Sequence, residues 1–397
     1  MIRFMNTDFL QNELDSLREQ GLYRSLRCVE SDQGPTLLLN GREVINFSSN
    51  NYLGIANHPA LAAAAKAAID RYGCGSGASR LISGNMTLHE ELEARLGQFK
   101  NAEAALVFNS GYQANVGILA TLAGAGDVIV SDALNHASII DGCRLSKATT
   151  VVYSHGDLDA LEMALKQAAS ARRRLVVTET IFSMDGDEAP LGEIVELAEK
   201  YRAMVMVDEA HGTGVYGANG AGVVAKLGLS SRVSVQMGTL GKALGGFGAY
   251  VAGSRALRDL LINRCRSFVF TTSLPPAVMA MALAAIDLVQ NEPQRRDRLR
   301  HNCQKLKLGL RRLGFELGSS ESPILPLIVG DAARCMDLSA ALLERGVFAQ
   351  GIRPPTVPAG TSRLRITVMA THSDEQIDRA LNVFEEVKRQ WPPTTIS

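Results

Sequence analysis

The sequence predicts an α/β protein: a mostly parallel central sheet with helices on both faces, plus a smaller C-terminal α+β domain. Three observations support this fold class. The chain has 397 residues, 46% hydrophobic and 21% charged, which exceeds one small domain and supplies a large core. Short apolar runs alternate with helix-length stretches from about residue 58 to 290. After that point a long polar helix opens a region with fewer strands.

The elements of the first 290 residues follow in a regular order. Residues 58–73 and 87–99 are predicted to be helices. Seven short β-rich runs are then expected to form strands, nearly all separated by enough residues for one helix: 104–109, 127–132, 150–154, 174–180, 203–210, 233–238 and 249–254. Such repetition favours a parallel sheet that is covered on both faces.

The C-terminal region is predicted to form its own small domain. Its expected elements are a polar helix, a strand, a helix, a strand and a final helix, over 292–314, 324–330, 332–346, 362–370 and 373–390. No internal repeat or low-complexity linker interrupts the chain. We therefore expect an N-terminal segment (1–55), a large domain (56–290) and a small C-terminal domain (291–397).

Composition argues against several classes of protein. Lys+Arg and Asp+Glu both number 41, so no net charge draws the chain to nucleic acid or to an anionic membrane. The six cysteines form no CxxC pair and no zinc-type cluster with histidine, so no metal site is expected. The N-terminus lacks the apolar core of a signal peptide, and the longest apolar run, 277–289, is too short for a membrane span. A cytoplasmic location is expected.

Residues 212–217 match the glycine spacing G-x-G-x-x-G after an apolar run, but the rest of a dinucleotide site is missing. Such a site needs an acid about 20 residues downstream for the ribose hydroxyl, and no Asp or Glu occurs between Glu209 and Asp259. A P-loop also fails, because Gln236 replaces its first glycine and Ala243 its Ser/Thr. The sequence therefore argues against a nicotinamide or nucleotide-phosphate site.

Acidic and basic residues at the ends of two neighbouring strands suggest a different cofactor. Asp208 ends one predicted strand, where open α/β sheets place ligand groups, and His211 follows it. Lys242 follows the next strand, among small residues with no acid nearby. Pyridoxal phosphate (PLP) needs a lysine amine for covalent attachment and an acid for its pyridine nitrogen. Asp-x-x-His followed by Thr-x-x-Lys therefore indicates a PLP site.

Other residues match the remaining needs of PLP. His211 and Ser183 would hydrogen-bond its phenolic oxygen, and His136 would stack on its ring. Ser110 lies in a Ser-Gly turn at an expected helix start, where backbone N–H groups favour a phosphate. Each alone has an ordinary alternative, such as an N-cap for Ser110 or a turn residue for Ser183. Together, matched roles at successive strand ends favour a cofactor site.

At these residues the sequence resembles the fold-type I PLP enzymes of the α-oxoamine synthase family. The similarity extends over nearly the whole chain. It is carried by NFSSNNYLG (46–54), GCGSGASRLISGNMTLHEELE (73–93), FNSGYQAN (108–115), DALNHASIIDGCRLS (132–146), TETIFSMDGDEAPL (178–191), VDEAHGTGVYG (207–217), GTLGKALGGFG (238–248) and FTTSLPP (270–276).

The resemblance implies a role for each matching residue. Lys242 would carry the cofactor and act in catalysis with His136 and Asp208. The implied cofactor-binding residues are Ser110, Gly111, Tyr112, His136, Ser183, Asp208, His211, Thr239, Lys242, Thr271 and Thr272. The two threonines match residues that reach the phosphate of the other subunit, which implies a homodimer with shared active sites. The implied substrate-binding residues are Asn50, Glu179, Arg353 and Arg365, and no metal is implied.

Family members condense a small amino acid with an acyl thioester and release carbon dioxide. Residues 351–367, GIRPPTVPAGTSRLRIT, are similar to the member that joins L-alanine to a pimeloyl thioester, whereas relatives that use glycine tend to lack this arginine and double proline. Pro354 and Pro355 would brace Arg353 for a substrate, although a rigid surface turn would look the same. The sequence leaves open whether coenzyme A or acyl carrier protein carries the pimeloyl group.

Overall fold

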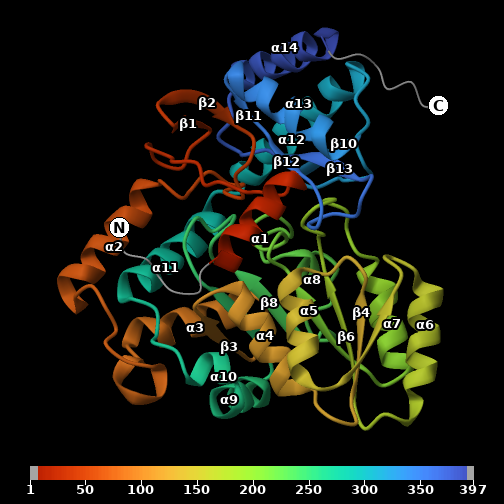
Figure 1. The fold of residues 1–397 in the computed structure, drawn as a ribbon. Coiled ribbons are helices and arrows are strands. Elements are labelled where there is room, and N and C mark those ends of the chain that lie inside the picture. The colour runs from red at the N-terminus through yellow and green to blue at the C-terminus, as the bar shows by residue number, and fades with distance from the viewer. Residues whose placement is uncertain (1–7, 391–397) are drawn as a thin grey trace.

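The computed structural model describes residues 8–390, and its centre is a seven-stranded sheet (Figure 1). The strand order is β3-β9-β8-β7-β6-β4-β5. The bounds are β3 (Ala104–Phe108), β4 (Val128–Asp132), β5 (Thr149–Tyr153), β6 (Arg174–Glu179), β7 (Met204–Asp208), β8 (Val235–Thr239) and β9 (Ala249–Gly253). All seven predicted strands are present.

The sheet is mostly parallel, as predicted. Only β9 runs against its neighbours, pairing antiparallel with β3 and β8. Short connections explain this, because residues 240–248 return the chain from β8 to β9 without a helix. Strands β5, β4, β6, β7 and β8 pair in parallel with one another, so their carboxyl ends share one edge of the sheet.

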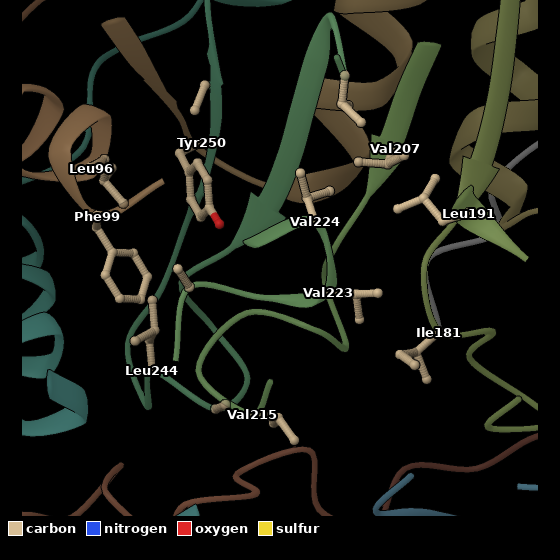
Figure 2. Close-up of a cluster of buried hydrophobic side chains, with 14 of the residues drawn as sticks. Leu96, Phe99, Ile181, Leu191, Val207, Val215, Val223, Val224, Leu244 and Tyr250 are labelled. Atoms are coloured by element: carbon tan, nitrogen blue, oxygen red, sulfur yellow. The ribbon is translucent and has the colours of Figure 1, made fainter. Parts of the chain in front are cut away.

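Alternate residues of the strands bury into two separate cores, one on each face. Val107, Val176 and Val207 belong to one cluster, whereas Leu106, Val177 and Met206 belong to the other. Figure 2 shows part of the first cluster, where Leu96 and Phe99 lie beside Tyr250. Because both faces are buried, the strands are nearly all apolar, which is the pattern that the sequence analysis used.

Helices from the intervening segments cover both faces. Helices α3, α6, α7 and α11 contribute to the first cluster, and α4, α5, α9 and α10 to the second. The helices of this part are α2 (Pro59–Tyr72), α3 (Thr87–Phe99), α4 (Gly111–Leu122), α5 (Ala137–Ser146), α6 (Leu158–Gln167), α7 (Leu191–Lys200), α8 (Val223–Lys226), α9 (Arg255–Arg264), α10 (Arg266–Val269) and α11 (Pro276–Asn291), with a π-helix at Arg80–Gly84 and a 3-10 helix at Ala168–Ser170. Within residues 8–390, no helix has the length and apolar character that crossing a membrane requires.

The C-terminal part contains the five predicted elements and two short strands that were not predicted. They are α12 (Gln294–Arg312), β10 (Ile324–Gly330), α13 (Ala332–Glu344), β11 (Val347–Phe348), β12 (Gln350–Ile352), β13 (Ser362–Thr367) and α14 (Asp374–Gln390). Strands β10, β13 and β12 form an antiparallel sheet that packs with α12, α13 and α14 around a third core.

Part of the N-terminal segment packs with this C-terminal region. Strand β2 (Arg42–Asn46) pairs with β1 (Thr36–Leu39) on one side and with β11 on the other. Ile45 and Phe47 complete the third core, and Figure 1 shows β1 and β2 beside α13. Helix α1 (Asp8–Glu19) precedes them and buries no side chain. The division at residues 55 and 290 stays a prediction, and these contacts favour counting residues 36–47 with the small domain.

Candidate active site

The predicted site residues gather at the carboxyl edge of the large sheet. Glu179 ends β6 and Asp208 ends β7, and the two residues are directly paired in the parallel register. Lys242 lies three residues beyond the end of β8, in the tight connection to β9. Neighbouring parallel strands end at one level, so the topology brings these three side chains together.

A chain of hydrogen bonds holds the Lys242 amine. Its Nζ lies 2.8 Å from Nε2 of His211, and Nδ1 of His211 lies 2.6 Å from the Tyr52 hydroxyl. Tyr52 in turn donates to Oδ1 of Asn50, at 3.2 Å. Every bond of this chain has one donor and one acceptor if His211 is neutral. Its Nδ1–H then donates to the Tyr52 hydroxyl, and its Nε2 lone pair accepts from the lysine.

Burial changes the protonation of both partners in this pair. Desolvation lowers the pKa of Lys242 to about 8, against the opposing attraction of Asp208 and Glu179. Burial also lowers the pKa of His211 well below its usual value, and the charge of Lys242 adds to this effect. The amine is therefore available in its neutral, nucleophilic form much closer to neutral pH than an exposed lysine.

The Asp208 carboxylate is buried and fixed by donors. Asn115 donates from Nδ2 to its Oδ2 at 2.8 Å, and the backbone N–H of Ala210 donates to its Oδ1 at 2.8 Å. Only 5% of Asp208 is exposed. A carboxylate held in this way, on the floor of a strand-end site, suits a protonated ring nitrogen.

Glu179 is a second buried acid beside Asp208. Burial raises its pKa well above the usual value, and the nearby charge of Asp208 raises it further. Its Oε1 atom is buried and has no hydrogen-bond partner among the described residues. The protonated form is thus favoured, and the Oε1 atom is free to form a hydrogen bond with a bound ligand.

Arg365 comes from β13 in the small domain and reaches the same site. Its Nε donates to the Ser183 carbonyl at 2.6 Å, and its Nη1 donates to Oδ1 of Asn50 at 3.1 Å. No carboxylate among residues 8–390 forms an ion pair with it. The fixed guanidinium is therefore available to the carboxylate of a substrate.

The phosphate candidates lie at the start of α4 and after β8. Ser110 is the N-cap of α4, where its Oγ accepts from the N–H of Gln113 at 3.2 Å, and Gly111 is the first helical residue. Thr239 ends β8 and donates to the Gly248 carbonyl at 3.0 Å. A helix start next to a threonine is a suitable anion site. The hydroxyl of Tyr112, half-exposed, instead donates to Asp141, at 2.8 Å.

Among residues 8–390, the predicted site residues Thr271, Thr272 and Arg353 form no hydrogen bond with the residues around Lys242. Asn109 donates to the Thr272 carbonyl at 2.8 Å and lies 3.5 Å from the Thr271 hydroxyl. Arg353 donates to the carbonyls of Gly21 and Tyr23, both at 3.0 Å, and so ties the N-terminal segment to the small domain. Their roles toward a cofactor or substrate stay predictions.

The structure adds residues to the site that the sequence analysis did not select. Tyr52 links His211 to Asn50, Asn115 binds Asp208, and Ser138 lies between Asn115 and His136. All three lie inside motifs that were quoted for the family resemblance. Their signal was present in the sequence, but only the contacts separate them from neighbouring residues of the same motifs.

These residues fit PLP. Lys242 would hold it covalently, Asp208 would pair with its ring nitrogen, and the start of α4 would take its phosphate. The unpaired Oε1 of Glu179 and the neutral His211 beside Lys242 are consistent with a polar ligand at the strand ends.

Comparison with known proteins agrees with this geometry. The family model for aminotransferase class I and II matches residues 42–384. The 8-amino-7-oxononanoate synthase of Geobacter sulfurreducens is 54% identical over 97% of this chain and 99% of its own length. A serine palmitoyltransferase from S. paucimobilis, with bound PLP–myriocin aldimine, superposes with a TM-score of 0.92 at 35% identity, over 98% of this chain and 99% of that chain. The 8-amino-7-oxononanoate synthase from Francisella tularensis superposes with a TM-score of 0.76 at 29% identity, over 88% of this chain and 99% of that chain.

Proposed function

The chain belongs to the aminotransferase class I and II family, and from this premise we propose that it joins L-alanine to a pimeloyl thioester, releasing carbon dioxide and a free thiol. The product would be 8-amino-7-oxononanoate, a precursor in biotin biosynthesis. The enzyme is a PLP-dependent acyltransferase of fold type I. The observation that carries the choice of substrates is the 54% identity, over nearly both full lengths, to a synthase of that name.

The residues of the site have matching tasks in this reaction. PLP, when bound, supplies an electron sink for charge that develops on the α-carbon of the amino acid. Arg365 would hold the carboxylate of L-alanine, and Asn50 keeps the guanidinium in place. Lys242 would take the α-proton at Nζ, because its lowered pKa leaves the amine ready to accept it. Asp208 would keep the ring nitrogen protonated.

His136 is the candidate for the acyl substrate. It is the N-cap of α5, and its ring lies close enough to Asp208 and Lys242 to respond to both charges. Neighbouring atoms desolvate the imidazole and lower its pKa, although part of the residue still reaches solvent in the single chain. A neutral imidazole would donate to the thioester carbonyl and polarise it for attack.

The competing function is a related synthase that uses glycine, either 2-amino-3-ketobutyrate CoA ligase or 5-aminolevulinate synthase. The solved serine palmitoyltransferase adds a further alternative, a synthase that uses serine and a palmitoyl thioester. Its TM-score of 0.92 exceeds the 0.76 of the solved oxononanoate synthase. Backbone similarity reports the shared fold, whereas substrate choice depends on side chains. The sequence identity therefore carries more weight here.

A substrate panel tests the proposal. The purified holoenzyme is given L-alanine, glycine or L-serine with pimeloyl, acetyl, succinyl or palmitoyl coenzyme A, and with pimeloyl acyl carrier protein. We expect thiol release and the mass of 8-amino-7-oxononanoate only with L-alanine and a pimeloyl thioester, and comparison of the two carriers identifies the natural one. A higher kcat/KM for glycine with a shorter acyl group would reject the proposal in favour of a related synthase.

A homodimer with shared active sites is part of the proposal. Thr271 and Thr272 are the residues expected to reach the phosphate of the partner subunit, and in the single chain they have no recorded contact with Lys242 or Ser110. Ile82 and Phe270, which directly precedes Thr271, have exposed apolar side chains that such a partner would cover. The expected cytoplasmic location also stays a prediction.

A further inference from the structure

Two buried polar residues, Asn115 and Ser138, connect Asp208 to His136 through a chain of hydrogen bonds. Asn115, on α4, donates from Nδ2 to Oδ2 of Asp208 at 2.8 Å and to Oγ of Ser138 at 2.9 Å. Ser138, on α5, lies 2.8 Å from Nδ1 of His136 through the same Oγ. Asn115 and Ser138 are each 1% exposed, so water does not compete for the two bonds that Asn115 donates.

The chemistry of the groups gives this chain one direction. The carboxylate of Asp208 only accepts, so the amide of Asn115 must turn its NH2 group and not its oxygen toward Asp208. The backbone N–H of Ser138 donates to Nδ1 of His136 at 3.2 Å, which makes Nδ1 an acceptor. Because Nδ1 is an acceptor, the Ser138 hydroxyl donates its proton to Nδ1 while its oxygen accepts from Asn115. The proton of the neutral imidazole is thus on Nε2.

We propose that Asn115 is a positioning residue that uses its two amide protons to hold Asp208 and, through Ser138, the Nε2–H tautomer of His136. It would fix the acid at the ring nitrogen and the donor on the ring face relative to each other. This inference rests on the proposed roles of Asp208 and His136 toward PLP. It assigns a task to Asn115 and Ser138, which are not among the residues proposed to bind PLP or substrate.

Packing alone does not account for an asparagine at position 115. Its neighbours on α4, Ala114, Ile118 and Leu119, are apolar and fully buried. The Oδ1 atom of Asn115 is itself buried and has no partner among the described residues. A buried amide with one unsatisfied group destabilises the fold. The two donated bonds give a reason for keeping the amide.

The first test measures the affinity for PLP. Asn115→Leu keeps the volume of the side chain and removes both donors. We expect the dissociation constant of PLP, measured by absorbance after stepwise dialysis of the holoenzyme, to rise about ten- to a hundredfold, since a hydrogen bond to a charged group is lost. Asn302→Leu is the matched control. Asn302, on α12, is also buried, but its side-chain amide donates to backbone carbonyls of residues 369–372, away from Asp208.

Unchanged PLP affinity in a folded Asn115→Leu protein would overturn the proposal, and so would equal losses in Asn115→Leu and Asn302→Leu. If circular dichroism shows that Asn115→Leu does not fold, Asn115→Ser replaces it, because its hydroxyl is too short to reach both partners. The same comparison with Asn302→Ser then decides.

The second test observes the tautomer of His136 by 15N NMR of the imidazole in the holoenzyme. We expect Nδ1 to resonate as an unprotonated acceptor, to shift in Ser138→Ala and in Asn115→Leu, and to return in Ser138→Thr, which keeps a hydroxyl. A protonated Nδ1 in the parent protein, or a resonance that is the same in every variant, would contradict the proposal. Both tests use PLP without substrate, so they are decided separately from the substrate panel.

Discussion

At Lys242, the reactivity of one residue depends on two features of its surroundings. Burial lowers the pKa of the amine to about 8, and His211 presents a lone pair at 2.8 Å. A lysine in solvent, with its usual pKa of 10.5, would be almost fully charged at neutral pH. The fold thus prepares this amine for covalent chemistry before any ligand binds.

The pH dependence of cofactor capture tests this residue. Only the neutral amine attacks the PLP aldehyde, so the rate of covalent attachment to the cofactor-free protein should rise with pH and level off above about 8. Stopped-flow absorbance at several pH values measures the midpoint. Lys242→Ala should show no covalent attachment and a turnover reduced by about a hundredfold or more. Lys226→Ala, on the surface and paired with Glu188, is the control. A midpoint near 10.5 would contradict the prediction.

At the scale of elements, the loop after β7 must be held so that His211 faces Lys242. A fully buried ion pair between Lys100 and Glu209 provides this support, with Lys100 at the end of α3 and Glu209 next to Asp208. Lys100 also bonds to the Ala221 carbonyl, and Glu209 accepts from the N–H of Val224 at 3.0 Å. The pair thus fixes both ends of the loop.

Replacing one member of this pair should be strongly destabilising. Lys100→Met leaves Glu209 charged and unpaired in the core, so we expect the free energy of unfolding to fall by about 3–5 kcal/mol. Denaturation by urea, followed by circular dichroism, measures it. Arg232→Met, which breaks an exposed pair with Glu199, should have a much smaller effect because solvent screens that pair. Similar losses in both variants would reject this assignment.

A second support holds the loop that carries Ser183. His155, just after β5, lies 3.0 Å from Asp132 at the end of β4 and 2.8 Å from Asp187 beyond β6. The two carboxylates raise the pKa of His155 from 6.5 to about 10. Phe182, next to Ser183, packs edge-on against the imidazole. A charged His155 therefore ties three strand ends together.

This arrangement predicts a pH dependence of stability. The pKa of His155 is higher in the folded protein, so its contribution is complete below about pH 6.5 and is lost as the pH rises through about 10. The urea midpoint should fall over this window. In His155→Gln, which cannot become charged, that part of the decrease should disappear and the midpoint at pH 6 should be lower. An identical pH profile in the two proteins would show that His155 does not carry the effect.

At the scale of the whole molecule, the site is assembled from distant parts of the chain. Asn50 and Tyr52 come from the N-terminal segment, Asp208 and Lys242 from the large sheet, and Arg365 from the small domain. An ion pair between Arg363 and Asp185 joins the small domain to the loop of Ser183. A movement of the small domain would therefore move the residues that hold the substrate carboxylate.

The proposed dimer makes a prediction at this scale. We expect two variants to have low activity when each is assayed alone, if Thr271 and Thr272 serve the partner's site. One is Lys242→Ala, and the other has both threonines changed to alanine. Mixed dimers, formed by refolding the two together, contain one site with both a native lysine and native threonines. Activity should rise to about a quarter of the native value, because about half of the dimers are mixed and each has one intact site. No gain on mixing would show that the sites are not shared.

Much of this fold could be predicted because its signals are local. The seven strands were identified from apolar runs, and fully buried parallel strands leave such runs. Strands β11 and β12, with two and three residues, are too short to leave a pattern. The attachment of β2 to β11 was not predictable either, because the partners are about 300 residues apart.

The sequence by itself determined the fold class and the cofactor, and the structure and relatives confirm both. Asp208, His211 and Lys242 could be selected because strand ends are recognisable and PLP needs an acid and an amine. The tertiary structure decided the rest: the hydrogen bonds of Asn115, Ser138 and Tyr52, and the commitment of Arg353 to the N-terminal segment. Hydrogen bonds and pKa shifts depend on distance and burial in space, and a linear sequence specifies neither until the chain is folded.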